Sequence, residues 1–210
     1  MSDFFPAGFF NRSDDQPDPF FYGPSRLVTH IDQTAIAAVG ALYTELGING
    51  RVLDLMSSWV SHFDTPPSHL TVLGMNKSEL DANPEATART IHDLNLDPVL
   101  PYPDASFDDV VCCVSVDYLT RPIEVFAEAA RVLRPGGRFV TTFSNRLFPT
   151  KAIRGWLTSD DTTRMQIVGH YFELAGGFEP PNLDIRLAPG NGSDPLYAVW
   201  AAISPRRRSD

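Results

Sequence analysis

The sequence has 210 residues, of which 43% are hydrophobic and 20% are charged, a balance typical of a folded globular protein rather than a disordered one. Its formal net charge of −9 disfavours general nucleic-acid binding, because nucleic acids are themselves anionic. No apolar run approaches the ~20 residues of a membrane span, and the acidic N-terminal stretch is unlike a signal peptide.

The only two cysteines, Cys112 and Cys113, are adjacent in an apolar run. Neighbouring residues of a strand point to opposite faces of the sheet, so these two thiols are not expected to pair with each other. A chain without disulfides fits a reducing compartment. We therefore expect a cytoplasmic protein with neither nucleic-acid nor membrane partners.

The first 23 residues combine Pro, Asp and Gly with several phenylalanines and a tyrosine. The polar residues are typical of a loop, whereas the aromatic residues are too apolar for a free tail. We expect an arm folded across the body, over a functional site. A helix is predicted from Pro24 to Leu46, because apolar residues recur there every three or four positions, and Gly47 should end it.

The rest of the chain alternates between strand-like apolar runs and segments with helical periodicity. Strands are predicted at 52–55, 71–73, 90–92, 109–114, 138–143, 184–187 and 197–203. Helices are predicted at 77–82, 122–133, 149–157 and 162–175. This alternation predicts an α/β fold, a seven-stranded, mainly parallel sheet with helices on both faces. No helix fits between the last two strands, so they should form a C-terminal antiparallel hairpin.

Four segments, in order, carry a resemblance to a known family. They are "RVLDL" at 51–55, "TVLGMNKSEL" at 71–80, "LPYPDASFDDVVCCVSVDYL" at 100–119 and "EAARVLRPGGRFVTTF" at 128–143. Together they resemble the class I S-adenosylmethionine-dependent methyltransferases, of the type 11-like kind. The resemblance implies a Rossmann-like fold and S-adenosylmethionine as cofactor, with S-adenosylhomocysteine as product. A compact, acidic chain with a closing arm and no appended recognition domain favours a small-molecule acceptor. We expect one domain, with an arm and cap helix at 1–46 and the core at 47–210.

In open parallel sheets, ligands bind beyond the carboxyl ends of the strands, where the strand order reverses. If the first and fourth strands flank that point, the crevice is lined by residues 54–58, 76, 93 and 115–117. This position and the family resemblance together give the predicted cofactor-binding residues, which are Asp54, Met56, Ser57, Ser58, Asn76, Asp93, Leu94 and Ser115.

The turn that follows Asp54 departs from the family's acid-x-Gly-x-Gly-x-Gly pattern. Its glycine places are held by Met56, Ser58 and Val60. Glycine serves there because it permits positive φ and a close ligand approach, which Met and β-branched Val resist. The hydroxyls of Ser57 and Ser58 can instead donate to a carboxylate. Two interpretations stay open: a reshaped cofactor pocket, or a catalytically silent family member that acts as a binding or interaction module.

Asn76 stands where the family has an acid that binds both ribose hydroxyls. Asparagine can bind a hydroxyl pair, and it also suits the cap of a helix opening at Lys77, so both roles stay open. Asp93 and Leu94 match the place where the family holds adenine, as an acceptor for the exocyclic amine and an apolar cover for the ring.

Methyl transfer needs mainly alignment, with a base only where the acceptor must lose a proton. The catalytic candidates are polar residues expected at strand ends and on the arm: Tyr22, His30, Asp117, Tyr118, Asn145 and Arg146. A histidine at such a position is more often a surface or packing residue than a base, and both roles stay open for His30. No histidine has metal-ligand spacing, so no metal site is predicted. A short dehydrogenase is disfavoured because no G-x-G-x-x-G follows a strand.

Overall fold

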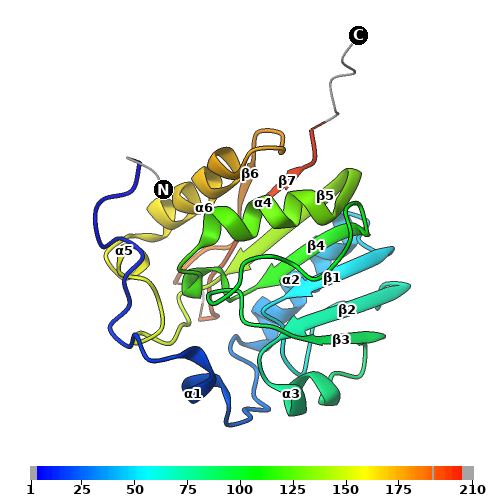
Figure 1. Ribbon diagram of the computed structural model, residues 1–210, viewed down its shortest axis with the longest axis horizontal. Helices are drawn as coiled ribbons and strands as arrows, with labels where there is room; N and C mark the ends of the chain where they lie inside the picture. The colour runs from blue at the N-terminus through cyan, green and yellow to red at the C-terminus, as the bar shows by residue number, and fades with distance from the viewer. Residues whose placement is uncertain (1–3, 191, 205–210) are drawn as a thin grey trace.

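The structure is a computed structural model that describes residues 4–190 and 192–204. Figure 1 shows the elements in place. In chain order they are α1 (Asp18–Tyr22), α2 (Gln33–Glu45), β1 (Arg51–Leu55), β2 (His69–Gly74), α3 (Lys77–Ala82), β3 (Ala88–Ile91), β4 (Phe107–Cys113), a short 3-10 helix (Val116–Tyr118), α4 (Pro122–Val132), β5 (Leu133–Phe143), α5 (Arg154–Leu157), α6 (Asp161–Ala175), β6 (Asn182–Leu187) and β7 (Leu196–Ala202).

The seven strands form one sheet in the order β3-β2-β1-β4-β5-β7-β6. The first five run parallel, whereas β7 is antiparallel to both β5 and β6. The seven predicted strands and the C-terminal hairpin are therefore confirmed. The chain order reverses between β1 and β4, which lie side by side at the middle of the sheet (Figure 1). The switch point predicted from the sequence is thus present.

Two apolar cores lie on the two faces of the sheet. On one face α4 and α6 run side by side (Figure 1), and Phe126 and Phe172 from these helices pack around Phe139 of β5. On the other face α2 and α3 contribute Leu42 and Leu80 to the second core. Helices cover both faces, as the alternating pattern predicts.

The predicted helix at Pro24–Leu46 is wrong at its start. Helix α2 begins at Gln33, where the Asp32 carboxylate accepts a hydrogen bond of 2.9 Å from the backbone N–H of Ala35. This cap opens the helix, and the residues before it belong to the arm. Its end is confirmed, because Gly47 has a φ of 66° directly after the helix. The predicted helix at 149–157 shortens to α5, Arg154–Leu157, and α1 was not predicted.

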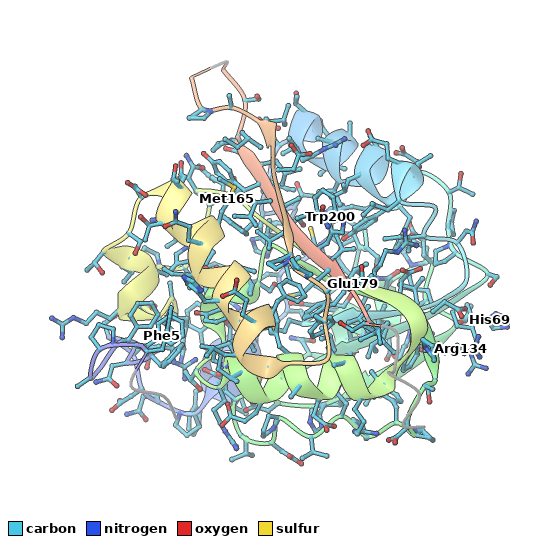
Figure 2. The ribbon with its side chains drawn as sticks, turned by 90° about the horizontal axis from the view of Figure 1, so that it is seen from above. Phe5, His69, Arg134, Met165, Glu179 and Trp200 are labelled. Carbon is cyan, nitrogen blue, oxygen red and sulfur yellow. The ribbon has the colours of Figure 1, made fainter. Side chains whose placement is uncertain are left out.

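The N-terminal arm, which we define as residues 4–31, crosses the body as predicted. Figure 1 shows it passing α5 and turning at α1. Phe5 and Phe9 pack on each other with ring centroids 4.6 Å apart, and Phe5 also contacts Tyr171 of α6. A Cβ on Gly155 would lie 2.2 Å from the Phe9 ring, so this close approach requires glycine. Phe5 lies on the opposite side of the molecule from His69 and Arg134 (Figure 2).

A buried ion cluster fastens the middle of the arm. Lys151 is 0% exposed, and its Nζ lies 3.2 Å from an Asp14 oxygen and 3.1 Å from an Asp18 oxygen. It also donates to the Gln16 carbonyl at 2.9 Å, while Arg12 donates to Asp18 at 2.8 Å. A buried charge needs such partners, because desolvation without them costs several kcal/mol. The cluster therefore holds residues 12–18 in one place.

Candidate functional site

A cavity of about 140 Å³ lies at the carboxyl ends of β1, β2 and β4, beneath the arm. We call it the first cavity. Its lining includes every residue predicted to bind the cofactor: Asp54, Met56, Ser57, Ser58, Asn76, Asp93, Leu94 and Ser115. The topological switch point therefore brings these residues together, although they span more than sixty positions of the chain.

Asp54 ends β1 on the cavity wall and is 3% exposed. Its carboxylate accepts a hydrogen bond of 2.7 Å from the Ser57 hydroxyl. Burial raises the pKa of Asp54 to about 7, although hydrogen bonds from Ser57 and Ser61 act in the opposite direction. A cationic group placed beside this carboxylate would restore its charged form. Asp54 is thus suited to bind an ammonium or sulfonium group.

The turn after β1 keeps a backbone conformation that favours glycine, without a glycine. Met56 has a φ of 54°, in the left-handed region that costs an L-residue roughly 1–2 kcal/mol. The glycine at a close backbone contact is instead Gly74 at the end of β2, where a Cβ would lie 2.3 Å from the Ser57 carbonyl oxygen. The Ser57 N–H donates to the Leu73 carbonyl at 2.8 Å. The turn therefore folds back against the end of β2.

Asn76 caps α3 and also holds the arm. Its Oδ1 accepts from the Glu79 N–H and from the Ser25 hydroxyl, each at 3.1 Å. Its Nδ2 donates to the carbonyls of Tyr22 and Gly23 at 3.0 and 2.8 Å. The predicted cap is confirmed. Both hydrogens of the amide and both lone pairs of its oxygen are used, so Asn76 can bind a ligand only where one of these partners gives way.

Two further residues attach the arm to the cavity rim. Glu79 accepts from the Arg26 N–H and from the Ser58 hydroxyl, each at 2.6 Å. Trp59 donates from Nε1 to the Val28 carbonyl at 3.0 Å. Ser58 and Trp59 belong to the glycine-less turn. The arm therefore docks on Asn76, on Glu79 and on Trp59.

The side of the first cavity next to β3 is held by Asn95, which the sequence interpretation missed. Asn95 donates to an Asp18 oxygen at 2.8 Å and to the Tyr118 carbonyl at 3.0 Å. Asp93 accepts from the N–H groups of Asn95 and Leu96, which shapes this turn. The word "HDLN" contains an Asx-turn signal in Asp93, but nothing local indicates the distant partner on the arm.

The catalytic candidates fall into three places. Tyr22, His30 and Tyr118 line the first cavity. Asn145 and Arg146 line a second, adjoining cavity, whose wall also includes His30 and Tyr118.

Asp117 lines neither cavity. It is 3% exposed, and burial raises its pKa to about 8. Its position in the short 3-10 helix after β4 places it among core residues instead, where the nearby carboxyl raises the pKa of Tyr171 further than burial alone does. The structure therefore brings five of the six catalytic candidates to the two cavities.

His30 and Tyr22 have properties that suit a binding site. Desolvation lowers the pKa of His30, Glu79 raises it and Arg26 lowers it, so the imidazole is neutral at pH 7 and can accept a proton. Its ring packs edge-on against Phe148, with centroids 5.2 Å apart. Among the described residues, the buried Tyr22 hydroxyl has no hydrogen-bond partner. An unpaired buried hydroxyl on a cavity wall is a group that a ligand can satisfy.

Within residues 4–190 and 192–204, no cluster of three or more His, Cys, Asp or Glu side chains is arranged to hold a metal ion. No helix in that part of the chain is long and apolar enough to cross a membrane.

Residues 47–141 match a family model described as "Methyltransferase domain". Over 123 residues the chain is 32% identical to a mitochondrial 2-methoxy-6-polyprenyl-1,4-benzoquinol methylase of Drosophila melanogaster, covering 53% of this chain and 40% of that relative. Over 39 residues it is 56% identical to 27-O-demethylrifamycin SV methyltransferase of Amycolatopsis mediterranei (strain S699), covering 19% and 14%. The matching part therefore spans less than half the length of either relative.

Solved structures resemble the chain over most of its length. A SAM-dependent methyltransferase from Aquifex aeolicus superposes with a TM-score of 0.58 at 15% identity, covering 82% of this chain and 94% of that one. One from Mesorhizobium loti gives 0.55 at 16%, covering 79% and 98%. The cyclase SpnF gives 0.56 at 14%, covering 85% and 86%. At these identities the likeness concerns the fold, which hosts more than one kind of named activity.

Proposed function

We propose that this chain is a class I S-adenosylmethionine-dependent methyltransferase and that it transfers a methyl group to a small-molecule acceptor in the cytoplasm. The observation that carries the proposal is the position of Asp54, buried in the cavity at the switch point between β1 and β4. Support for a small acceptor comes from the curated relatives, whose names refer to a benzoquinol and a rifamycin.

The residues present fit the cofactor. Four carboxyl groups line the first cavity, from Asp18, Asp54, Glu79 and Asp93, against one arginine, Arg26. Asp18 is paired with Arg12 and Lys151, so the other three acids, Asp54, Glu79 and Asp93, are the ones that favour a ligand with cationic groups. Leu94 supplies an apolar surface for adenine. The cofactor, when bound, supplies a methyl group on a positively charged sulfur, and Asp54 with Ser57 would hold its amino-acid end.

His30 is the group we assign to the acceptor's proton, because it lies on the wall shared by the two cavities. For a hydroxyl acceptor, whose oxygen would take the methyl group from the cofactor's sulfur, the imidazole of His30 would take up the proton that the hydroxyl has to lose. His30 then has to be neutral before each turnover.

The rate should therefore fall as the pH drops through the lowered pKa of His30, at a pH below the ordinary 6.5 of histidine. His30→Gln should lose this acidic limb and about 10²-fold in rate, the typical contribution of a general base. The measurement is S-adenosylhomocysteine release with an acceptor found by screening small hydroxyl compounds. A variant that retained the parent's rate and pH profile would exclude His30 as the base.

Ligand-dependent stability tests the proposed function itself. S-adenosylhomocysteine at one hundred times its dissociation constant should stabilise the protein by about 2.7 kcal/mol. The experiment is thermal unfolding with and without the ligand, together with calorimetric titration. The absence of both a stability shift and binding heat at millimolar ligand would refute the cofactor assignment.

A catalytically silent binding module is the second candidate. Two observations favour it. Both hydrogens of the Asn76 amide are donated to the arm, and Met56 occupies a strained backbone conformation in the turn. The first cavity also has about 140 Å³, below the ~300 Å³ at which ligand sites begin. Under this alternative the arm stays closed and S-adenosylhomocysteine does not bind, so the same titration separates the two functions.

A further inference from the structure

We propose that the second cavity is an acceptor site for planar, hydroxyl-bearing carboxylates, and that Arg146 binds their carboxylate. This inference rests on the proposed function, since it takes the first cavity as the cofactor site. The second cavity has a volume of about 480 Å³, within the range of small-molecule sites. The arm contributes Thr29 and His30 to it, and the segment after β5 contributes Asn145, Arg146 and Phe148.

The two cavities adjoin but differ in charge. They share His30, Tyr118 and Phe148 as a common wall, so a molecule in the second cavity lies next to the contents of the first. The first cavity is lined by four carboxyl groups and one arginine. The lining of the second contains Arg146 and no aspartate or glutamate. An anion is therefore favoured in the second cavity and disfavoured in the first.

Arg146 is available to a ligand. Its side chain is 63% exposed, and its one ion-pair contact among the described residues is with Asp194, at 3.9 Å. The same Asp194 carboxylate already accepts a hydrogen bond of 2.9 Å from the Asp32 N–H. An exposed pair at this separation contributes little to stability. A guanidinium binds a carboxylate with two parallel hydrogen bonds, so a ligand carboxylate would compete well for Arg146.

Two aromatic residues, Tyr118 and Phe148, line the same cavity. The rings of Tyr118 and Phe148 lie 5.9 Å apart at 32°, and the Arg26 guanidinium lies 5.7 Å from the Phe148 centroid. Aromatic faces arranged in this way pack against planar rings in offset or edge-on contact. A planar acceptor anchored through its carboxylate at Arg146 would pack against these rings, which together with His30 also line the first cavity.

Three probes of the same size test the charge preference: 4-hydroxybenzoate, 4-hydroxybenzamide and tyramine. Each is titrated calorimetrically into the full chain saturated with S-adenosylhomocysteine. We expect 4-hydroxybenzoate to bind at least tenfold more tightly than the neutral amide, and the cationic tyramine to bind most weakly. Equal affinities, the reverse order, or no binding by any of the three would overturn the inference.

Arg146→Ala should weaken 4-hydroxybenzoate binding at least tenfold and leave S-adenosylhomocysteine affinity unchanged. The matched control is Arg51→Ala, which should change neither affinity. Arg51 is an exposed arginine at the amino end of β1, in register with His69 at the amino end of β2. Unchanged 4-hydroxybenzoate affinity in Arg146→Ala would contradict the inference alone. A parent protein that fails to bind S-adenosylhomocysteine would instead contradict the proposed function, so the two failures are distinguishable.

Discussion

Replacing Asp54 with asparagine is expected to abolish S-adenosylhomocysteine binding and, at pH 8, to make the ligand-free protein more stable. The loss of binding should be at least about 100-fold, because an ion pair with a buried carboxylate is removed and its site stays desolvated. The gain in stability follows from the burial of Asp54, which raises its pKa to about 7 against an ordinary value of 3.8.

The sign of the stability change can be worked out from proton binding. Above pH 4 the unfolded chain releases the Asp54 proton, whereas the folded protein keeps it up to about pH 7. The stability of the parent therefore falls as the pH rises through this window. The rise in the pKa from 3.8 to about 7 corresponds to a loss of up to about 4 kcal/mol in the free energy of unfolding above pH 7. The substituted amide does not titrate, so the advantage of the variant should shrink as the pH is lowered towards 5.

Denaturant unfolding at pH 5 and pH 8, with parallel calorimetry, measures both effects. Asp81→Asn is the matched control, because Asp81 is half exposed on α3 and pairs with Lys77 away from the buried carboxylate. It should change neither S-adenosylhomocysteine affinity nor the pH dependence of stability. Unaltered affinity in Asp54→Asn would show that the cofactor site lies elsewhere.

Asn76→Asp is expected to release the arm and to strengthen S-adenosylhomocysteine binding. The substitution removes both hydrogen bonds from Nδ2 and places a carboxylate oxygen against the carbonyls of Tyr22 and Gly23. Leaving such buried acceptors unpaired costs about 1–3 kcal/mol each. Aspartate caps a helix as well as asparagine does, so α3 should persist. A carboxylate at this position also accepts from ribose hydroxyls, so affinity should rise about tenfold.

Limited proteolysis of the arm and calorimetric titration test this expectation together. The arm should be cleaved between residues 18 and 31 faster in Asn76→Asp than in the parent. Asn182→Asp, on the edge strand β6, serves as the control and should leave both measurements unchanged. If the variant is cleaved as slowly as the parent and binds S-adenosylhomocysteine with the same affinity, Asn76 does not hold the arm closed and does not lie near the ribose.

Most of the fold could be predicted because its strands are encoded locally. Runs such as Arg51–Leu55 and Phe107–Cys113 are apolar over most of their length, as strands covered on both faces must be. The start of α2 was mispredicted because Leu27 and Ile31 continue the helical spacing into the arm. Only the cap at Asp32 marks the boundary, and that is a single side chain in a sequence rich in aspartate.

The site could be predicted as far as the topology of the sheet determines it. Asp54, Asp93 and Ser115 lie at or just after the carboxyl ends of the parallel strands β1, β3 and β4, so all three are expected at the same end of the sheet. The contacts of Asn76 and Trp59 with the arm could not be predicted, because their partners are backbone carbonyls more than thirty positions away in sequence. Every residue has a backbone carbonyl, so the amino-acid sequence does not indicate which carbonyl a distant side chain will bind.

The two attachments of the arm have a kinetic consequence. Lys151 anchors Asp14 and Asp18 in the buried cluster, whereas Asn76 holds Tyr22 and Gly23 at the cavity rim. The rim attachment can open while the anchor keeps the arm in place, so closing needs no new search for the docked position. Under the proposed function, every turnover breaks and re-forms the rim hydrogen bonds. Product release then requires these hydrogen bonds to open, a kind of step that limits kcat in many enzymes.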